Sequence, residues 1–443
     1  MSISEIIKSI PKDFTFGTAT SSYQIEGSAF GGCGESHWDS FARQRHATYL
    51  NQNGSIACNH FDHWKEDLDL IRAAGFSAYR FSFSWPRILP DGKKAVNSSG
   101  IDFYDRLIDG LLERDILPFA TLYHWDLPQT LAEIGGWTNT ETSDWFGSYA
   151  ELVMKYFGNR LHSIATVNEP WCVSWLSHYI GEHAPGKKNF AAAVRSMHII
   201  LKAHGKACTA IRAMGHKNIG IVLNKQYMMP QVNAELDISA CNLSDEIHNL
   251  WFDEAIFNGK YPRETLKLFN KHMPKNFDSD LEEISQRLDW IGINYYTRSL
   301  VRASEEEKTL GFKTVNGQLE KTDMGWEVFP EGLSFLIKRL SKEYSGSLPI
   351  YITENGMANK DEIINGRVKD DKRIEYFELH LKELKTLIDA GYPLRGYFTW
   401  SLLDNFEWAF GYSKRFGLVY VDFDNQERLP KASYHAFAKA LLS

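Results

Sequence analysis

Two glutamates, Glu169 and Glu354, each follow a short apolar run, in the segments TVNEP and YITENG. Glutamate is a poor helix cap, and burying an unpaired carboxylate costs several kcal/mol, so a purely structural role explains these positions badly. Two carboxylates that flank a substrate can hydrolyse an acetal, because one attacks or activates water while the other protonates the leaving group. We therefore expect Glu169 and Glu354 to face one another, although they are far apart in the chain.

The two carboxylates must also differ in protonation. At a separation of about 5.5 Å and an effective dielectric constant near 20, two carboxylates repel by about 3 kcal/mol, or roughly two pK units. One of them should therefore hold its proton near neutrality. Arg80, at the end of another apolar run, could keep one of the pair ionised, and the spacing does not say which.

Eight apolar runs of strand length position these residues. They cover residues 14–20, 78–83, 117–123, 163–169, 218–224, 290–296, 349–355 and 394–400. Continuous apolar runs are typical of parallel strands that are covered on both faces. Helical patterns lie between them, at 64–75, 101–115 and 374–391, and the first and last end at Gly75 and Gly391.

Eight strand and helix units without a linker or an internal repeat predict an α/β fold, a single (β/α)8 TIM barrel over residues 1–443. The extra length should lie in extended βα loops, at about 22–60, 297–329 and 401–430, which would form the pocket. The alternative is an open doubly wound sheet, which would need a G-x-G-x-x-G turn after its first strand. That turn is absent, and the glycines of residues 31–34 are expected only to permit tight turns.

In such a barrel, functional side chains lie at the carboxyl ends of the strands. The predicted strand ends carry polar or aromatic residues: Gln24, Arg80, His124, Trp125, Asn168, Asn224, Asn294, Tyr296, Asn355 and Trp400. Any one of them could be a helix cap or a satisfied core residue. Five tryptophans, Trp125, Trp171, Trp326, Trp400 and Trp408, are expected on the same face. Indole packs against the C–H face of a sugar ring, so this cluster beside two carboxylates favours a carbohydrate substrate.

The composition excludes several classes of protein. The net charge of −7 favours no nucleic-acid partner, and no run of eighteen apolar residues could span a membrane. The five cysteines are scattered, and Glu5 and Lys8 interrupt the N-terminal apolar stretch, so we expect no secretory signal and a cytoplasmic location. The pairs His60 with His63 and His198 with His204 lack a third ligand, so no metal is expected. The oligomeric state stays open.

Several ordered motifs resemble those of family 1 glycoside hydrolases, the β-glucosidase family. They are FTFGTATSSYQIEG (14–27), YRFSFSWPRI (79–88), TVNEP (166–170), INYYT (293–297), YITENG (351–356) and TWSLLDNFEWAFGYSKRFGLVYVDF (399–423). The resemblance runs from Phe14 to the C-terminus. It implies a (β/α)8 barrel, a retaining double displacement on small β-glucosides such as cellobiose, and no cofactor.

The resemblance also implies roles for individual residues. Glu169 matches the acid/base and Glu354 the nucleophile; Arg80 and Tyr296 match residues that contact the nucleophile, and Asn168 the residue that binds the sugar 2-hydroxyl. The pocket for the non-reducing sugar matches Gln24, His124, Trp125, Trp400, Glu407 and Trp408. The aglycone side matches Trp171, Leu176 and Trp326. Phe410 departs from the Glu or Tyr that is more usual at its position.

Related branches remain as alternatives. A 6-phospho-β-glycosidase typically has Ser where Glu407 stands and Tyr where Phe416 stands, so an unphosphorylated sugar is favoured despite the nearby Lys414 and Arg415. A catalytically silent sugar-binding barrel normally lacks one catalytic glutamate, and both are present. The resemblance leaves the preference among glucoside, galactoside and fucoside open.

Overall fold

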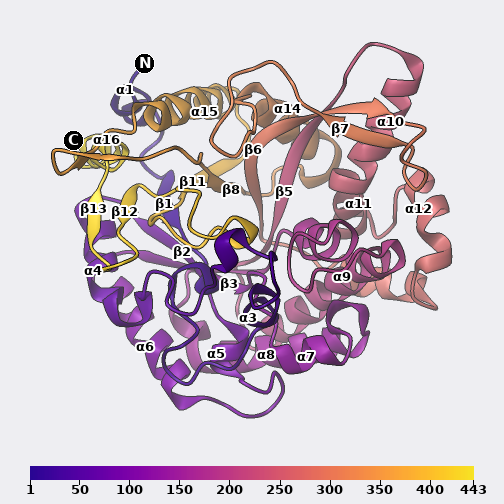
Figure 1. Ribbon diagram of the computed structural model, residues 1–443, viewed down its shortest axis with the longest axis horizontal. Helices are drawn as coiled ribbons and strands as arrows, with labels where there is room; N and C mark the ends of the chain where they lie inside the picture. The colour runs from indigo at the N-terminus through magenta and orange to yellow at the C-terminus, as the bar shows by residue number, and fades with distance from the viewer.

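The computed structural model describes residues 1–443 and has a closed barrel of eight parallel strands at its centre (Figure 1). The strands are β1 (Thr15–Ala19), β2 (Ala78–Ser82), β3 (Leu117–Tyr123), β4 (Ser163–Asn168), β5 (Ile219–Pro230), β6 (Trp290–Ala303), β8 (Ile350–Asn355) and β11 (Leu394–Trp400). Neighbours in the chain pair in parallel, and the pairing of β1 with β11 closes the ring. The predicted (β/α)8 barrel is confirmed.

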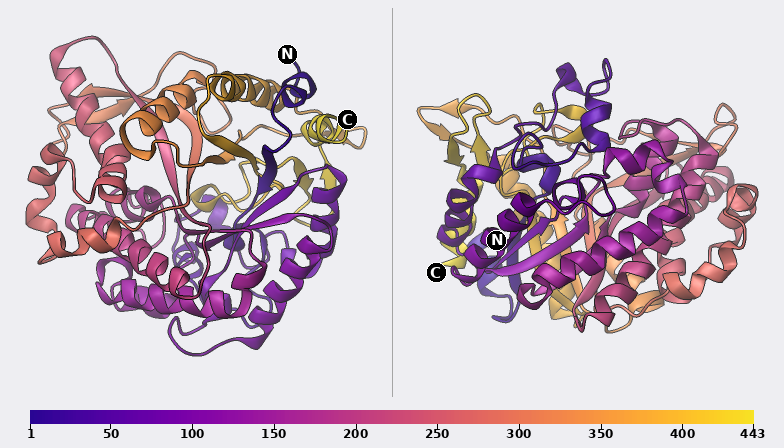
Figure 2. Two further views of the ribbon diagram at one scale, coloured as in Figure 1. Left: turned by 180° about the vertical axis from the view of Figure 1, so that it is seen from behind. Right: turned by 90° about the horizontal axis from the view of Figure 1, so that it is seen from below.

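Helices surround the barrel, as Figure 2 shows from two further sides. The longer ones are α4 (His60–Ala73), α6 (Ser98–Leu112), α8 (Glu141–Phe157), α9 (Phe190–Ala213), α10 (Glu235–Asp245), α11 (Trp251–Asn258), α14 (Glu331–Leu340), α15 (Asp371–Asp389) and α16 (Ala432–Leu441). The three helices predicted from periodicity correspond to α4, α6 and α15. Gly75 and Gly391 follow α4 and α15 with φ of 78° and 83°, a left-handed conformation that glycine adopts at little cost.

Short elements complete the chain. The short helices are α1 (Ile3–Lys8), α2 (Ser22–Ile25), α3 (His37–Ala42), α5 (Trp85–Ile88), α7 (Gln129–Glu133), α12 (Arg263–Phe269) and α13 (Leu281–Ile284). The short strands are β7 (Phe312–Val315), β9 (Ile363–Ile364), β10 (Arg367–Val368), β12 (Val419–Val421) and β13 (Arg428–Pro430). Three segments are π-helical: η4 (Cys172–Ile180), η5 (Glu246–Leu250) and η8 (Ser341–Ser345). Short 3-10 turns are η1 (Tyr49–Asn51), η2 (Gly136–Thr138), η3 (Gly158–Arg160), η6 (Asn270–His272), η7 (Phe277–Asp280) and η9 (Trp408–Phe410).

The expected loop at 297–329 is partly strand. β6 continues to Ala303 beside β5 and then pairs with the antiparallel β7. Beyond Tyr296 the residues of β6 alternate between buried and more exposed positions as far as Arg302. A search for continuous apolar runs therefore stops too early, because this part of the strand is covered on one face only.

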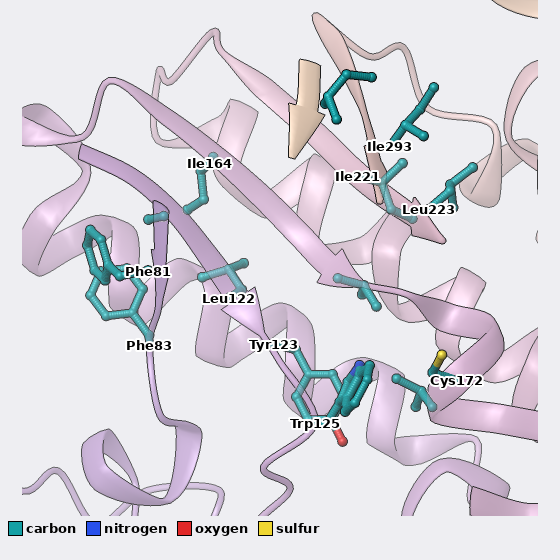
Figure 3. Close-up of a cluster of buried hydrophobic side chains, with 14 of the residues drawn as sticks. Phe81, Phe83, Leu122, Tyr123, Trp125, Ile164, Cys172, Ile221, Leu223 and Ile293 are labelled. Atoms are coloured by element: carbon teal, nitrogen blue, oxygen red, sulfur yellow. The ribbon is translucent and has the colours of Figure 1, made fainter. Parts of the chain in front are cut away.

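The main hydrophobic core contains 99 buried residues and joins the barrel strands to the helices around them. Figure 3 shows core side chains from consecutive strands, including Phe81, Leu122, Ile164, Ile221 and Ile293. Inside the barrel, Phe119 packs against Phe398 and Tyr351, with ring centroids 4.9 and 5.5 Å apart. These rings fill the interior, which leaves the carboxyl ends of the strands as the place for a pocket.

The two ends of the chain pack together on one side of the barrel (Figure 1). α1 contacts both α15 and α16, and buries Ile3, Ile6 and Ile7. None of the helices has the length and apolar character needed to cross a lipid bilayer.

Candidate active site

Glu169 directly follows β4, and Glu354 is the last residue but one of β8. Both side chains line one cavity of about 300 Å³ at the carboxyl ends of the strands. Both residues are almost fully buried, with 5% and 3% of their surface exposed. The fold therefore brings together two carboxylates that the sequence separates. Their hydrogen-bonding partners are different, and this difference sets their chemistry.

Glu354 is held by a cation and a phenol. Arg80 Nη1 donates to Oε1 over 2.5 Å, and the Tyr296 hydroxyl donates to Oε2 over 2.6 Å. Burial raises the pKa of Glu354, but the Arg80 charge and these hydrogen bonds act in the opposite direction. Arg80 thus supports the ionised form of Glu354. The sequence spacing did not say which of the two glutamates Arg80 would keep ionised, and the structure shows that it is Glu354.

Glu169 has no cationic hydrogen-bonding partner. Its Oε1 accepts from Asn294 Nδ2 over 2.6 Å, and its Oε2 accepts from Cys172 Sγ over 3.0 Å. Burial, together with the nearby charge of Glu354, raises the pKa of Glu169 to about 7. Of the two glutamates, Glu169 is therefore the one that can hold a proton near neutrality.

A network of amides connects the two glutamates. The Oδ1 atom of Asn168 accepts from Arg80 Nη2 over 2.7 Å and from Asn294 Nδ2 over 3.1 Å. The Oδ1 atom of Asn294 accepts from the Thr353 hydroxyl over 2.7 Å. Asn168 Nδ2 lies 3.1 Å from His124 Nε2. Because each amide is held by several partners, the carboxylates are fixed in position before any substrate binds.

Three residues of the cavity have unusual backbone conformations. Trp125, Glu169 and Trp408 have φ of 79°, 52° and 49°. Residues other than glycine adopt positive φ at a cost, and such residues concentrate at functional sites, where the surrounding structure holds them. Gly356, the glycine of the ENG segment (354–356), has another constraint: a Cβ atom there would lie 1.8 Å from the carbonyl oxygen of Trp400.

Aromatic rings form one wall of the cavity. The rings of Trp125 and Trp408 lie 4.7 Å apart, and the ring of His124 lies 5.8 Å from that of Trp400. His183, which the sequence reasoning did not select, packs against Trp125 at 5.1 Å. This wall offers the flat, partly polar surface that suits a sugar ring.

Glu407 also lines the cavity, on the loop that follows β11. Its Oε2 atom accepts a long hydrogen bond of 3.4 Å from Gln24 Nε2. Burial, together with the charges of Glu354 and Glu169, raises the pKa of Glu407 to about 8. Glu407 is one of four carboxyl groups that line the cavity, with Glu169, Glu182 and Glu354.

Three of the predicted residues lie behind the cavity wall. Gln24, Arg80 and Asn168 are buried and are not part of the lining. Gln24 Nε2 donates to the Asn405 side chain and to the Phe406 carbonyl, each over 3.0 Å. In the structure Gln24 contacts Glu407 and Arg80 contacts Glu354, and the sugar contacts that the resemblance implies for Gln24 and Asn168 stay predictions.

Comparison with known proteins identifies the family. Residues 6–442 match the model described as glycosyl hydrolase family 1. The chain belongs to glycosyl hydrolase family 1. It is 46% identical over 431 residues to a β-glucosidase of an Agrobacterium species, covering 96% of this chain and 93% of that one. It is 41% identical over 450 residues to a bifunctional β-D-glucosidase/β-D-fucosidase of Bifidobacterium breve, covering 96% of each.

A solved structure supports the same assignment. The family 1 β-glucosidase from Thermotoga maritima superimposes with a TM-score of 0.95 at 43% identity, and the match covers 98% of both chains. As a member of this family, the protein is a hydrolase that acts on glycosidic bonds.

The cavity of this family 1 hydrolase is also lined by Trp171, Leu176 and Trp326, the residues expected on the aglycone side. His248 also lines it, 4.2 Å from the Trp171 ring and 3.3 Å from Asn224 Nδ2. His248 follows no strand, so a search of strand ends could not find it.

Other lining residues were also missed by the sequence reasoning: Cys172, Glu182, Lys225, Gln226 and Met324. Cys172 could have been found, because it comes three residues after Glu169, one turn along the segment that leads into η4. Lys225 and Gln226 lie in the part of β5 beyond the predicted strand end at Asn224, and Glu182 and Met324 lie in loops.

Two cations near the cavity are already paired. Lys414 Nζ lies 2.9 Å from Asp323 Oδ2, and Arg415 Nη1 lies 2.7 Å from Asp404 Oδ2. Both side chains therefore connect loops of the family 1 barrel.

The histidines considered as metal ligands are engaged elsewhere. His60 Nδ1 lies 2.7 Å from Asp67, His198 lies 2.7 Å from the Tyr261 hydroxyl, and His204 lies 2.6 Å from the Thr166 hydroxyl. No group of three or more His, Cys, Asp or Glu side chains is arranged to hold a metal ion.

Proposed function

We propose that this family 1 hydrolase is a retaining β-glucosidase. Its substrates would be cellobiose, short cello-oligosaccharides and aryl or alkyl β-glucosides, from which it removes the terminal non-reducing β-D-glucosyl residue. One observation carries the proposal: the two buried glutamates of one cavity have opposite environments, Glu354 with a guanidinium and a phenol and Glu169 with an amide and a thiol. The β-glucosidases among its relatives support the choice of glucose.

In the first step, a carboxylate oxygen of Glu354 attacks the anomeric carbon while the protonated Glu169 gives its proton to the glycosidic oxygen. The C–O bond to the leaving group breaks, and a covalent glycosyl-enzyme forms. Arg80 and Tyr296 hold the carboxylate of Glu354 in the ionised, attacking state.

In the second step, Glu169 must act as a base. Esterification removes the negative charge of Glu354, and that charge is one cause of the raised pKa of Glu169. The pKa of Glu169 therefore falls when the intermediate forms. Glu169 can then take a proton from water, which attacks the anomeric carbon and releases glucose and the free carboxylate of Glu354.

The sugar itself would be recognised by Glu407, with Trp400 and Trp408 beside it. We propose that Gln24 holds Glu407 so that the carboxyl group can bridge two neighbouring hydroxyls. β-Galactosides and β-fucosides are further candidate substrates. The relative from Bifidobacterium breve, which is named for both glucosidase and fucosidase activity, supports the fucoside.

The alternatives have less support. A 6-phosphoglycoside would need a free cation for its phosphate, whereas Lys414 and Arg415 are paired with aspartates. A catalytically silent sugar-binding barrel would not require two carboxyl groups of which one is protonated and the other is ionised. We further propose a cytoplasmic location, which the five free cysteines support.

The test is hydrolysis of p-nitrophenyl β-glucoside, compared with the galactoside, the fucoside and the glucoside 6-phosphate. Glu354→Ala should lower kcat by about 10⁴-fold or more, and azide should restore turnover with α-glucosyl azide as the product. Glu113→Ala, an exposed glutamate at the end of α6, is the control and should keep full activity. Turnover of the 6-phosphate alone would overturn the choice of sugar, and an active Glu354→Ala would overturn the choice of nucleophile.

A further inference from the structure

A second cavity begins where the active-site cavity ends. It has a volume of about 520 Å³ and shares three lining residues with the first cavity: Gln226, Thr297 and Trp326. Its walls come from the outer part of β6, from β7 and from the turns that follow β7. In Figure 1 these strands extend beyond the barrel. We call this second cavity the distal groove; a leaving group that passes Trp326 would enter it.

The distal groove carries a net positive charge. Three of its lining residues are cations, Arg298, Lys313 and Lys321, and one is an anion, Glu327. The whole chain has a net charge of −7, so this local excess of cations is unusual for the molecule. A positive groove next to a site attracts and orients the negative part of a ligand.

Both oxygens of the one carboxylate in the groove accept hydrogen bonds from the protein. Glu327 Oε2 accepts from Arg298 Nε over 2.7 Å, and Glu327 Oε1 accepts from the backbone amide of Leu319 over 2.7 Å. A Cβ atom on Gly317 would lie 1.9 Å from Glu327 Oε1, so glycine at this position lets the carboxylate pack against the backbone. Glu327 therefore pairs with Arg298, and neither lysine forms an ion pair with a carboxylate that lines the groove.

Those two lysines are available to a ligand. Lys321 is exposed and forms no ion pair in the structure. Lys313 pairs with Glu306 over 2.9 Å, but the side chains of this pair are 40% and 82% exposed, and such surface pairs are weak. Gln226, Ser299 and Asn316 also line the groove with side chains that make no hydrogen bond to the protein.

The position of Lys321 is fixed relative to the active site. Lys321 and Glu327 form an antiparallel bridge, and the Thr322 amide donates to the Trp326 carbonyl over 2.9 Å. This turn places Trp326 between the two cavities and Lys321 on the far side. Lys414 anchors the turn through Asp323.

We propose that the distal groove binds a carboxylate on the leaving group, one unit beyond the group that directly follows the scissile bond. This inference rests on the proposed β-glucosidase function. The ionised carboxylate of Glu354 lies at the reacting centre of the active-site cavity, so this cavity disfavours an anion close to the scissile bond. A substrate that is neutral near the reacting centre and anionic further away matches both cavities.

The experiment compares kcat/KM for two matched pairs of probes. The first pair is cellobiose and its counterpart oxidised at the reducing end to the aldonic acid, which places the carboxylate beside the scissile bond. The second pair is cellotriose and its aldonic acid, which places the carboxylate one unit further out. We expect no preference for the acid in the shorter pair and a preference of about two- to five-fold in the longer pair at low salt. Salt at about 0.5 M should remove the preference.

A charge reversal tests the residue. Lys321→Glu should abolish or invert the preference for the longer acid and leave the kcat/KM for cellotriose within about two-fold. Lys271→Glu, a change of the same size at an exposed lysine in η6 outside the groove, should keep the preference.

The outcomes separate the two proposals. If p-nitrophenyl β-glucoside and cellobiose are not hydrolysed, the proposed function fails. If they are hydrolysed but the longer acid is not preferred, or Lys321→Glu leaves its preference unchanged, the distal groove is not a carboxylate site.

Discussion

At the scale of single residues, the type of partner decides what each glutamate can do. Both glutamates are buried, and burial favours the protonated form of either. The guanidinium of Arg80 offsets this for Glu354, whereas Glu169 has only the neutral donors Asn294 and Cys172. Two identical side chains thus become an anion and an acid.

This difference predicts the pH dependence of the reaction. kcat/KM for cellobiose should fall above a pH of about 7, because Glu169 then loses the proton that the basic sugar leaving group needs. The Cys172 thiol donates to the ionised form of Glu169 and lowers its pKa. Cys172→Val should therefore shift the basic limb upward by about 0.4 to 1 pH unit.

The matched control is Cys208→Val, a buried cysteine on α9 that contacts His204 and not Glu169. Its pH profile should equal that of the wild type. A downward shift of the basic limb in Cys172→Val would contradict the role of the thiol as a donor.

At the scale of secondary-structure elements, the ends of β8 and β11 must come very close together. β8 carries Glu354 and β11 ends at Trp400, and Gly356 lies where the chain leaving β8 passes the Trp400 carbonyl. The contact is with backbone, which cannot rotate away as a side chain can. The glycine of the ENG segment is therefore required by packing between two strand ends.

Gly356→Ala should displace one of these strand ends, because its Cβ would lie 1.8 Å from the Trp400 carbonyl oxygen. A displacement of about 1 Å in an active site can cost about 10²-fold in rate, and we expect kcat/KM to fall by about that factor. Steady-state kinetics and the urea midpoint of unfolding measure the two effects.

Gly147→Ala in α8 is the control, since its Cβ would meet Lys206 Cβ at an ordinary 3.4 Å. It should keep its activity and gain up to about 1 kcal/mol in stability from the better helix propensity of alanine. Wild-type kinetics in Gly356→Ala would show that the strand ends can separate without cost.

At the scale of the whole molecule, a buried ionic network joins the last part of the chain to the loops of the active-site face. Lys431, just before α16, lies 2.6 Å from Asp361 and 2.6 Å from Asp404. Asp361 follows β8 and also pairs with Arg373 of α15 over 2.8 Å. Asp404 follows β11 and pairs with Arg415. The network thus connects the two loops that continue from Glu354 and lead to Glu407.

Lys431→Met should be strongly destabilising, because it leaves two buried aspartates without one of their cations. Loss of one partner from a buried ion pair costs about 3–5 kcal/mol, and we expect the free energy of unfolding to fall by about that amount. Urea unfolding followed by tryptophan fluorescence measures it.

Lys372→Met gives the comparison, since Lys372 pairs with Glu320 at the surface with side chains 65% and 60% exposed. That substitution should cost no more than about 1 kcal/mol. Equal effects of the two substitutions would mean that the buried network adds nothing to stability.

Much of this organisation could be predicted from the sequence. Strands covered on both faces need continuous apolar runs, so all eight barrel strands were visible, and the helices α4, α6 and α15 followed from their apolar spacing. Glu169 and Glu354 stood out because a carboxylate after a buried strand has no ordinary structural role. These signals are local, and a single segment carries each of them.

The tertiary structure decided everything that depends on partners from distant segments. Arg80 pairs with Glu354, which lies 274 residues further along the chain, and no local pattern could assign it to that glutamate. His183, His248 and the distal groove come from loops and from the half-buried end of β6. The physical reason is that pKa values and cavity shapes depend on what surrounds a group in space, whereas a sequence pattern reports only which face of its own element is buried.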